Sequence, residues 1–310
     1  MTITKNAKDL LFPEFDNIEV STKTYTATTN LNIDIKELFK MLPITPYVVV
    51  AKRRGRKKKV DTVDPNSHVE KGSIITIKCE GELRGVDLKP KKVKPGAANK
   101  KWFRNSITIV IILDKPINFK ICRNGTFQMT GCKTHNHAEQ CIKYIWKYIK
   151  DVPELYTYSS GTTVETLFIP SMRNIDFSVG FLVDREKLNR YMSTQDKFHC
   201  LLETSFGYTG VNIKIPLEND IATMDVKRLT YTKDDTWEEV WTTYQEYLDK
   251  LTEKERQTKI ENSRYNTFLV FHSGKVIMSG LTDKFMKDIY YYFIDIMREC
   301  YDRVEERLVE

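Results

Sequence analysis

Two short stretches of the chain, Gly125-Thr-Phe-Gln-Met-Thr-Gly131 and Gly274-Lys-Val-Ile-Met-Ser-Gly280, match in register at an offset of 149 residues. In each, a strand-like core stands between glycines, and a segment with helical spacing of apolar residues follows. Residues 34–41 and 184–191 match at an offset of 150, and each follows a β-prone run. Two matches in the same order at nearly one offset predict a duplicated unit of strand, short helix, several strands and long helix.

The two predicted copies cover residues 14–152 and 164–310 and carry insertions at different places. In the first copy, residues 52–101 form the insertion. In the second copy, the insertion is about 217–264, and its apolar residues from Trp237 to Leu251 have helical spacing. This stripe predicts a helix over 236–261 that either packs on the core of its own domain or serves as a docking face for a partner.

The chain has a net charge of +7, and its excess of basic residues lies in the first insertion. Residues 52–101 hold 16 Lys/Arg against 6 Asp/Glu, whereas the rest of the chain holds 33 against 36. Within it lies a basic tract that consists of Lys52, Arg53, Arg54, Arg56, Lys57, Lys58 and Lys59. Such a tract is typical of non-specific phosphate contact, of a nuclear-import signal or of a solvated loop.

The composition is that of a globular protein, with 41% hydrophobic residues and a mean hydropathy of −0.45. The sequence shows neither a membrane-spanning apolar run nor a signal-peptide pattern, so we expect an intracellular protein with six reduced cysteines and no membrane association. The phosphate loop, the nucleophile elbow and the zinc-protease helix motif are all missing from the sequence. We therefore predict that the protein is not an enzyme and has neither a cofactor nor a small-molecule substrate.

A group of cysteines and histidines, Cys132-x-x-His135-x-His137-x-x-x-Cys141, has residue types that bind zinc. Four ligands within ten residues, partly in a helix, would make a strained tetrahedron. We expect buried cysteines and surface histidines here, and no metal.

Three segments resemble motifs of the TATA-box-binding protein family. Phe271-His-Ser-Gly-Lys-Val-Ile-Met-Ser-Gly280 is similar to the family's strand–turn–strand signature. Phe206-Gly-Tyr-Thr-Gly-Val-Asn-Ile-Lys-Ile-Pro216 is similar to the strand before it, and residues 107–131 resemble the same hairpin in the first copy. Apart from the insertions, the resemblance extends over most of the chain. It implies an α+β fold in which two pseudo-symmetric copies form a saddle, with a curved antiparallel sheet, helices on the convex face and a concave face for the DNA minor groove.

The resemblance implies specific roles for residues of the second copy. Phe206 and Phe271 match the family's wedge residues, which enter between base steps at a cost of a few kcal/mol that the bent duplex offsets. Ile277 and Ser279 match positions on the groove floor, and Lys275 matches a phosphate contact. A further candidate is Asn174, which lies two residues from the position of the family's own Asn.

The first copy departs from this pattern. Cys122 and Ser106 stand at its wedge positions, Gln128 stands where the second copy has Ile277, and Thr130 fits the hydroxyl position. Because a serine or cysteine is too small to separate base pairs, we predict one strong kink, made by the second copy.

The predicted function is that of a general transcription initiation factor. It would bind A·T-rich promoter DNA in the minor groove, bend it, and recruit other initiation factors or RNA polymerase. The insertions and the altered wedge positions point to a divergent lineage such as that of a large DNA virus. The setting would be the nucleus or, for a virus, a cytoplasmic replication site. The alternative is a saddle-fold interaction scaffold in a transcription complex that does not bend DNA.

Overall fold

The computed structural model describes residues 10–50, 64–88, 104–195, 198–202, 210–218 and 220–306. It divides into two compact units. The α2 unit comprises Thr24–Ile169 and Lys227–Trp241, and the α6 unit comprises Met1–Lys23, Pro170–Val226 and Thr242–Glu310. The two units therefore differ from the two copies predicted from the sequence, because part of the second insertion belongs to the same unit as most of the first copy.

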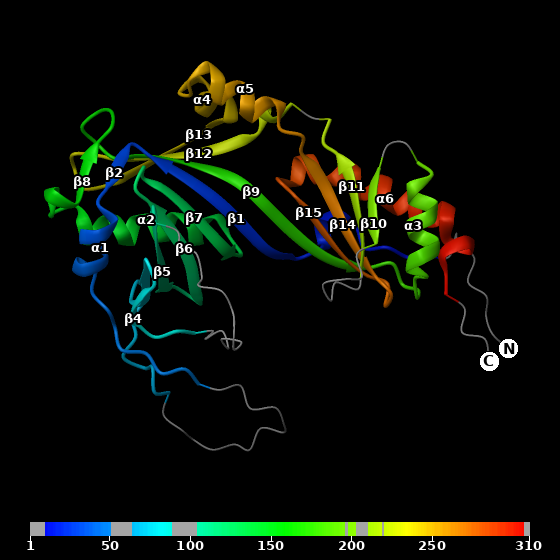
Figure 1. Ribbon diagram of the computed structural model, residues 1–310, viewed down its shortest axis with the longest axis horizontal. Helices are drawn as coiled ribbons and strands as arrows, with labels where there is room; N and C mark the ends of the chain where they lie inside the picture. Colours follow the sequence, from blue (N-terminus) through cyan, green and yellow to red (C-terminus); the bar gives the residue numbers. More distant parts are fainter. Residues whose placement is uncertain are drawn as a thin grey trace. The chain divides into compact units, whose positions relative to one another are not determined.

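Most elements in the first half of the chain belong to the α2 unit (Figure 1). In chain order they are β1 (Val20–Thr29), which starts in the α6 unit, β2 (Leu31–Ile33), α1 (Ile35–Met41), β3 (Ile74–Cys79), β4 (Glu82–Gly85), β5 (Ser106–Ile112), β6 (Pro116–Cys122), β7 (Thr126–Cys132), α2 (His135–Ile149) and β8 (Tyr156–Tyr158).

The second half begins with β9, which starts in the α2 unit and ends in the α6 unit. In chain order the elements are β9 (Glu165–Ser178), α3 (Arg185–Ser193), β10 (His199–Leu202), β11 (Gly210–Pro216), β12 (Asp225–Tyr231), β13 (Trp237–Thr243), α4 (Tyr244–Asp249), α5 (Glu253–Glu261), β14 (Tyr265–Phe271), β15 (Lys275–Gly280) and α6 (Asp283–Val304). Single 3₁₀ turns lie at Phe15–Asn17, Pro153–Leu155 and Ile221–Thr223.

In the α2 unit, the strands of the main sheet follow the order β1-β7-β6-β5-β3-β4. Alternate residues of these strands are buried, as expected for a sheet that is covered on one face. The buried residues Ile121 and Met129 share one core with Ile142 and Ile145 of α2. Helix α2 therefore covers one face of this sheet, and no helix formed by the described residues covers the other face.

The α6 unit repeats this arrangement with the order β10-β11-β14-β15-β9. Its core joins the buried residues of these strands to α6, and the rings of Phe268 and Phe293 stack with their centroids 4.1 Å apart. Phe177 of β9 meets Phe293 edge-on at 6.1 Å. One face of this sheet is therefore also covered by a helix.

Several elements of the two halves repeat at the offsets found in the sequence. Strands β6 and β14 have bounds that differ by 149 at both ends, and β7 and β15 start 149 residues apart. Asp34 and Asp184, 150 residues apart, cap α1 and α3 in the same way, because each side chain accepts hydrogen bonds from the second and third backbone N–H groups after it.

Both hairpin turns require glycine, which explains why glycine stands at the same place in the two sequence motifs. Gly125 and Gly274 have φ values of +67° and +74°, which favour glycine. A Cβ at Gly125 would lie 2.1 Å from the carbonyl oxygen of Leu31, and one at Gly274 would lie 2.1 Å from that of Phe181. These two carbonyls are again 150 residues apart. Every strand pairing described is antiparallel, so the predicted α+β class with a tandem repeat is confirmed.

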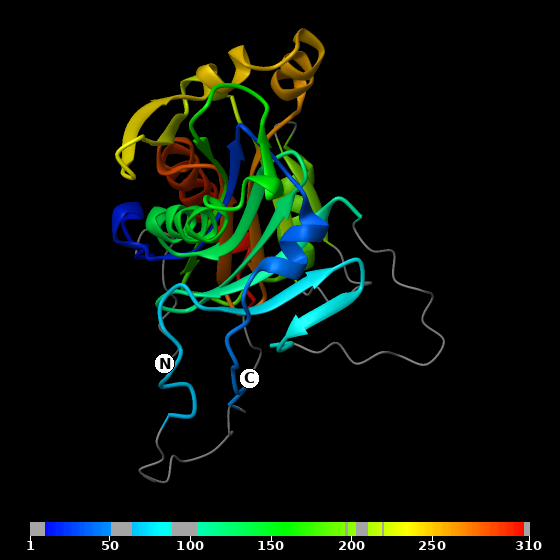
Figure 2. The same ribbon diagram turned by 90° about the vertical axis from the view of Figure 1, so that its left-hand side faces the viewer.

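Strand β3 belongs to the repeat, although the sequence placed it inside an insertion. It pairs with β5 in the same way that β10 pairs with β11. The extra chain of the first copy therefore lies on both sides of β3 and includes β4, which forms a hairpin with β3 (Figure 2).

The single helix predicted over 236–261 is wrong in its first part. Trp237–Thr243 forms β13, which pairs with β12, and two short helices follow it. The spacing of Trp237, Val240 and Trp241 also fits a helix, but Trp, Val and Thr have a high preference for strands and β12 offers a partner. Tyr244 and Leu248 are buried, whereas Val240 and Trp241 are exposed, so the stripe is not one continuous face.

Lys227 of β12 connects its hairpin to α2 through buried charges. Its Nζ donates to Glu139 Oε1 at 2.7 Å and lies 2.5 Å from Glu239 Oε2 and 5.7 Å from the ring centre of Trp241. Burial lowers the pKa of Lys227, but the hydrogen bonds to both carboxylates outweigh it and raise the pKa overall. The side chains of Lys227 and Glu139 are each 8% exposed, which makes this a buried ion pair. None of the helices formed by the described residues has the length and hydropathy to cross a membrane.

Candidate nucleic-acid interface

In the described part of the α6 unit, one face of the sheet is not covered by a helix. In β15, Val276 and Met278 are buried toward α6, while the alternate residues Lys275, Ile277 and Ser279 lie on the opposite face. We call this face the α6 open face. Its side chains are those of Asn174, Asp176, Ser178, Asn212, Lys214, Thr267, Leu269, Phe271, Lys275, Ile277 and Ser279.

Cross-strand pairs align the predicted contact residues in rows. Ser279 lies opposite Thr267 on β14 and opposite Asn174 on β9. The next row places Ile277 opposite Leu269 and Asp176. The structure therefore brings Asn174, Ile277 and Ser279 together on one face, as the sequence predicted, and adds Leu269 beside them.

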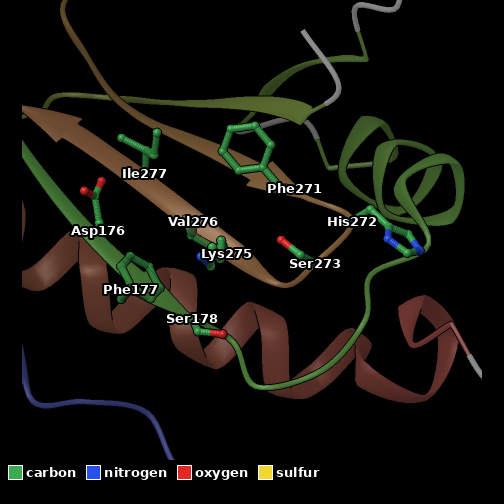
Figure 3. A pocket seen from close by; sticks show the side chains of 9 residues that line it. All are labelled: Asp176, Phe177, Ser178, Phe271, His272, Ser273, Lys275, Val276 and Ile277. Atoms are coloured by element: carbon green, nitrogen blue, oxygen red, sulfur yellow. The ribbon is translucent and has the colours of Figure 1, made fainter. Parts of the chain in front are cut away.

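Phe271 stands at the end of β14, where the open face ends. It pairs with Gly210 of β11 and helps to line a shallow depression (Figure 3). Phe271 and Ile277 project on the side away from α6, whereas Phe177 of the same depression packs in the core beneath. The half-buried Phe271 ring is accessible from the open face. Its predicted partner Phe206 lies outside the described residues.

Two polar groups of this face have distinct surroundings. The side-chain oxygen of Asn174 is buried and has no hydrogen-bond partner within the described part of the chain. An unsatisfied buried acceptor costs about 1–3 kcal/mol. A hydrogen bond from a donor of a bound ligand would therefore stabilise the complex. Asp176 is exposed beside Ile277 in the depression and was not predicted from the sequence. Its carboxylate opposes phosphate contact at this position.

The α2 unit has an equivalent helix-free face, the α2 open face, with different chemistry. It includes the side chains of Lys78, Ser106, Thr108, Asn118, Lys120, Cys122, Gln128 and Thr130. The predicted residues Gln128 and Thr130 are both exposed there. Cys122 pairs with Ser106 across β5 and β6, and burial raises the pKa of its thiol, which therefore stays neutral.

The pairing corrects one predicted equivalence between the copies. Cys122 and Phe271 correspond, and they pair with Ser106 and Gly210, respectively. Ser106 is thus the counterpart of Gly210 and not of Phe206, so its assignment to a wedge position is wrong by four residues. Pro116 begins β6 whereas Pro216 ends β11, so these two prolines are not equivalent positions of the repeat. In the sequence, Trp102 precedes Ser106 by four residues, as Phe206 precedes Gly210.

The basic residues predicted to contact phosphate lie outside the described residues, as does Trp102. They are Lys52, Arg53, Arg54, Arg56, Lys57, Lys58 and Lys59. Lys275 is described at the start of β15, where it is exposed and lies opposite Ser178.

The cysteine and histidine residues lie in separate environments, and the expectation of surface histidines is wrong for His137, which is buried. Cys132 and Cys141 are fully buried, and burial raises the pKa of the Cys132 thiol to about 11. His137 Nδ1 accepts a hydrogen bond from the backbone N–H of Lys133, and Nε2 lies 2.8 Å from Asp114 Oδ1. His135 packs against the rings of Tyr25, Phe168 and Trp241. Within the described ranges, no group of three or more His, Cys, Asp or Glu side chains is arranged to hold a metal ion.

The fold and the two faces define an α+β tandem-repeat protein in which each copy presents a helix-free sheet face. No model of a known protein family matches the chain. Uncharacterized protein 335L of invertebrate iridescent virus 6 is 28% identical over 202 residues, which cover 62% of this chain and 59% of that protein. A TATA-box-binding protein-like protein of Acanthamoeba polyphaga mimivirus is 25% identical over 233 residues, 64% of this chain and 54% of that protein.

The chain thus spans little more than half the length of these two viral relatives. The structure of Methanococcus jannaschii TBP aligns with a TM-score of 0.43 and 14% identity, over 93% of this chain and 99% of that one. The predicted resemblance to TATA-box-binding proteins is confirmed by the mimivirus protein, and the viral relatives agree with a divergent viral lineage.

Proposed function

We propose that the protein binds A·T-rich DNA in the minor groove through its open faces and bends it. The observation that carries this proposal is the α6 open face, where Phe271, Leu269 and Ile277 are presented without a covering helix. In the minor groove, A·T pairs display only acceptors, and the G·C pair adds a protruding amino group. Apolar side chains such as Ile277 fit a floor that lacks this group, and the hydroxyl of Ser279 can donate to the acceptors.

The role that follows is transcription initiation, in which the bent duplex and the protein together recruit initiation factors or RNA polymerase. Its support is the likeness to a viral protein that is described as TATA-box-binding protein-like. The role requires binding and no catalysis. It would be performed wherever the genome is transcribed, in the nucleus or at a cytoplasmic replication site.

Competition with small ligands tests the mode of binding. A netropsin-like ligand, which fills the minor groove, should displace the protein from an A·T-rich duplex, whereas a major-groove blocker should not. The opposite pattern would refute minor-groove binding.

Substitution of the wedge residue tests the proposed contact. Phe271→Ala should reduce the bend angle and weaken binding by about tenfold, because the remaining side chain cannot compensate for unstacking. Tyr292→Ala is the matched control, since Tyr292 is an exposed aromatic residue on α6, which covers the other face. Cys122→Ala should change the bend little. Gel mobility of circularly permuted duplexes measures the bend, and equal effects of all three variants would exclude the wedge role.

The alternative, an interaction scaffold that does not bend DNA, is favoured by one observation. Val240 and Trp241 of β13 are 48% and 61% exposed, and exposed apolar side chains of this size are typical of protein contacts. A protein that binds RNA polymerase and leaves the bend angle of every tested duplex unchanged would support the scaffold.

A further inference from the structure

The two copies carry opposite chemistry at one structurally equivalent pair of positions. In β6 and β7, Lys120 lies directly opposite Gln128. In β14 and β15, Leu269 lies directly opposite Ile277. Both pairs are on the open faces, and their members correspond at the offset of 149 residues that aligns the hairpins. The same place on the repeat is therefore polar in one copy and apolar in the other.

The polar character extends along a row of the α2 open face. Lys120 is also opposite Thr108, and Thr108 is opposite Lys78, whose Nζ lies 2.8 Å from Asp87. In the next row, the hydroxyl of Thr130 donates to the backbone carbonyl of Asn118 at 3.3 Å. Gln128 is exposed, and its amide makes no hydrogen bond to any other part of the chain that the structure describes. Within the described residues, its oxygen and its nitrogen are therefore both open to a ligand.

The amide of Gln128 matches the one feature that distinguishes base pairs in the minor groove. A G·C pair adds the guanine amino group, which is a donor, to acceptors that all pairs share. The oxygen of Gln128 can accept from this amino group, and the ammonium of Lys120 can donate to a neighbouring acceptor. Ile277 offers no acceptor, so a guanine beneath it would leave its amino group unpaired, at a cost in affinity.

We infer that the α2 open face reads a G·C pair through Gln128, while the α6 open face requires A·T pairs. This inference rests on the proposed minor-groove function and specifies its sequence preference. It predicts a mixed binding site with a G·C position in one half only.

Selection from random duplexes, followed by inosine substitution, tests the inference. The wild-type protein should select sites with G·C in one half. Replacing that guanine by inosine, which lacks the amino group, should weaken binding about tenfold. Gln128→Ile should remove the preference for G·C and make the protein insensitive to inosine. Gln128 is exposed on a strand that tolerates β-branched residues, so this variant should fold.

The converse variant provides the matched control. Ile277→Gln should allow a G·C pair in the other half and make that position sensitive to inosine. If the protein binds A·T-rich duplexes but excludes G·C equally from both halves, and Gln128→Ile selects the same sites, the inference is wrong and the proposed function stands. If no duplex is bound in the minor groove, the proposed function fails, and the inference fails with it.

Discussion

The buried ion pair between Lys227 and Glu139 should determine whether the β12–β13 hairpin stays on α2. Lys227→Met would leave the Glu139 carboxylate 8% exposed and without its closest partner. Breaking a buried pair from one side costs about 3–5 kcal/mol. Lys143 remains 3.5 Å from the other carboxylate oxygen, so we expect the lower end, about 3 kcal/mol. This corresponds to a fall in the melting temperature of the α2 unit by about 6–12 °C.

Trp146, Trp237 and Trp241, the tryptophans that the structure describes, all belong to the α2 unit, so their fluorescence reports its unfolding. The control is Lys143→Met, the same substitution at a lysine that is 35% exposed beside the same glutamate, and it should cost at most about 1 kcal/mol. The double variant Lys227→Met/Glu139→Gln should recover part of the stability, because no buried charge is stranded. Equal unfolding midpoints for Lys227→Met and Lys143→Met in urea would refute the reasoning.

Two further predictions concern residues outside the described ranges. Deletion of the basic tract, residues 52–59, should flatten the dependence of log K on log salt, by about 0.9 for each phosphate that the protein no longer neutralises, and leave sequence preference intact; an unchanged slope would assign the tract to localisation or to binding of other proteins. Trp102→Ala should reduce DNA bending more than Ser106→Ala, because the pairing of Ser106 with Cys122 gives Trp102 the sequence position that Phe206 has in the other copy; equal bend angles for the two variants would remove Trp102 as a wedge.

The hairpins could be predicted from the sequence because their local signals agree. Glycine at positive φ, alternation of buried and exposed residues, and an aspartate before each short helix all follow from local backbone chemistry. The same signals placed Ile277, Ser279, Gln128 and Thr130 on one face of their strands, as observed. Their contacts with DNA remain predictions.

Other features depend on partners that are distant in sequence. The segment 237–243 fits either a helix or a strand by spacing, and its pairing with β12 decides for the strand. Strand β3 could not be assigned to the repeat because the connection before it, from Met41 to Ile74, is far longer than that from Ser193 to His199. The contrast between Lys120 and Leu269 was visible in principle. Extending the offset of 149 from the turn glycines back into the preceding strand would have found it.

The difference between the two open faces bears on the direction in which such a protein would lie on DNA. If both copies carried the same side chains, a duplex with nearly two-fold symmetry could be occupied in either orientation with equal free energy. The pairs Lys120–Gln128 and Leu269–Ile277 remove that equality. A discrimination of about 1–3 kcal/mol at one base pair corresponds to roughly a 5- to 150-fold bias toward one orientation. For a factor that positions a polymerase, this bias would select the strand that is transcribed.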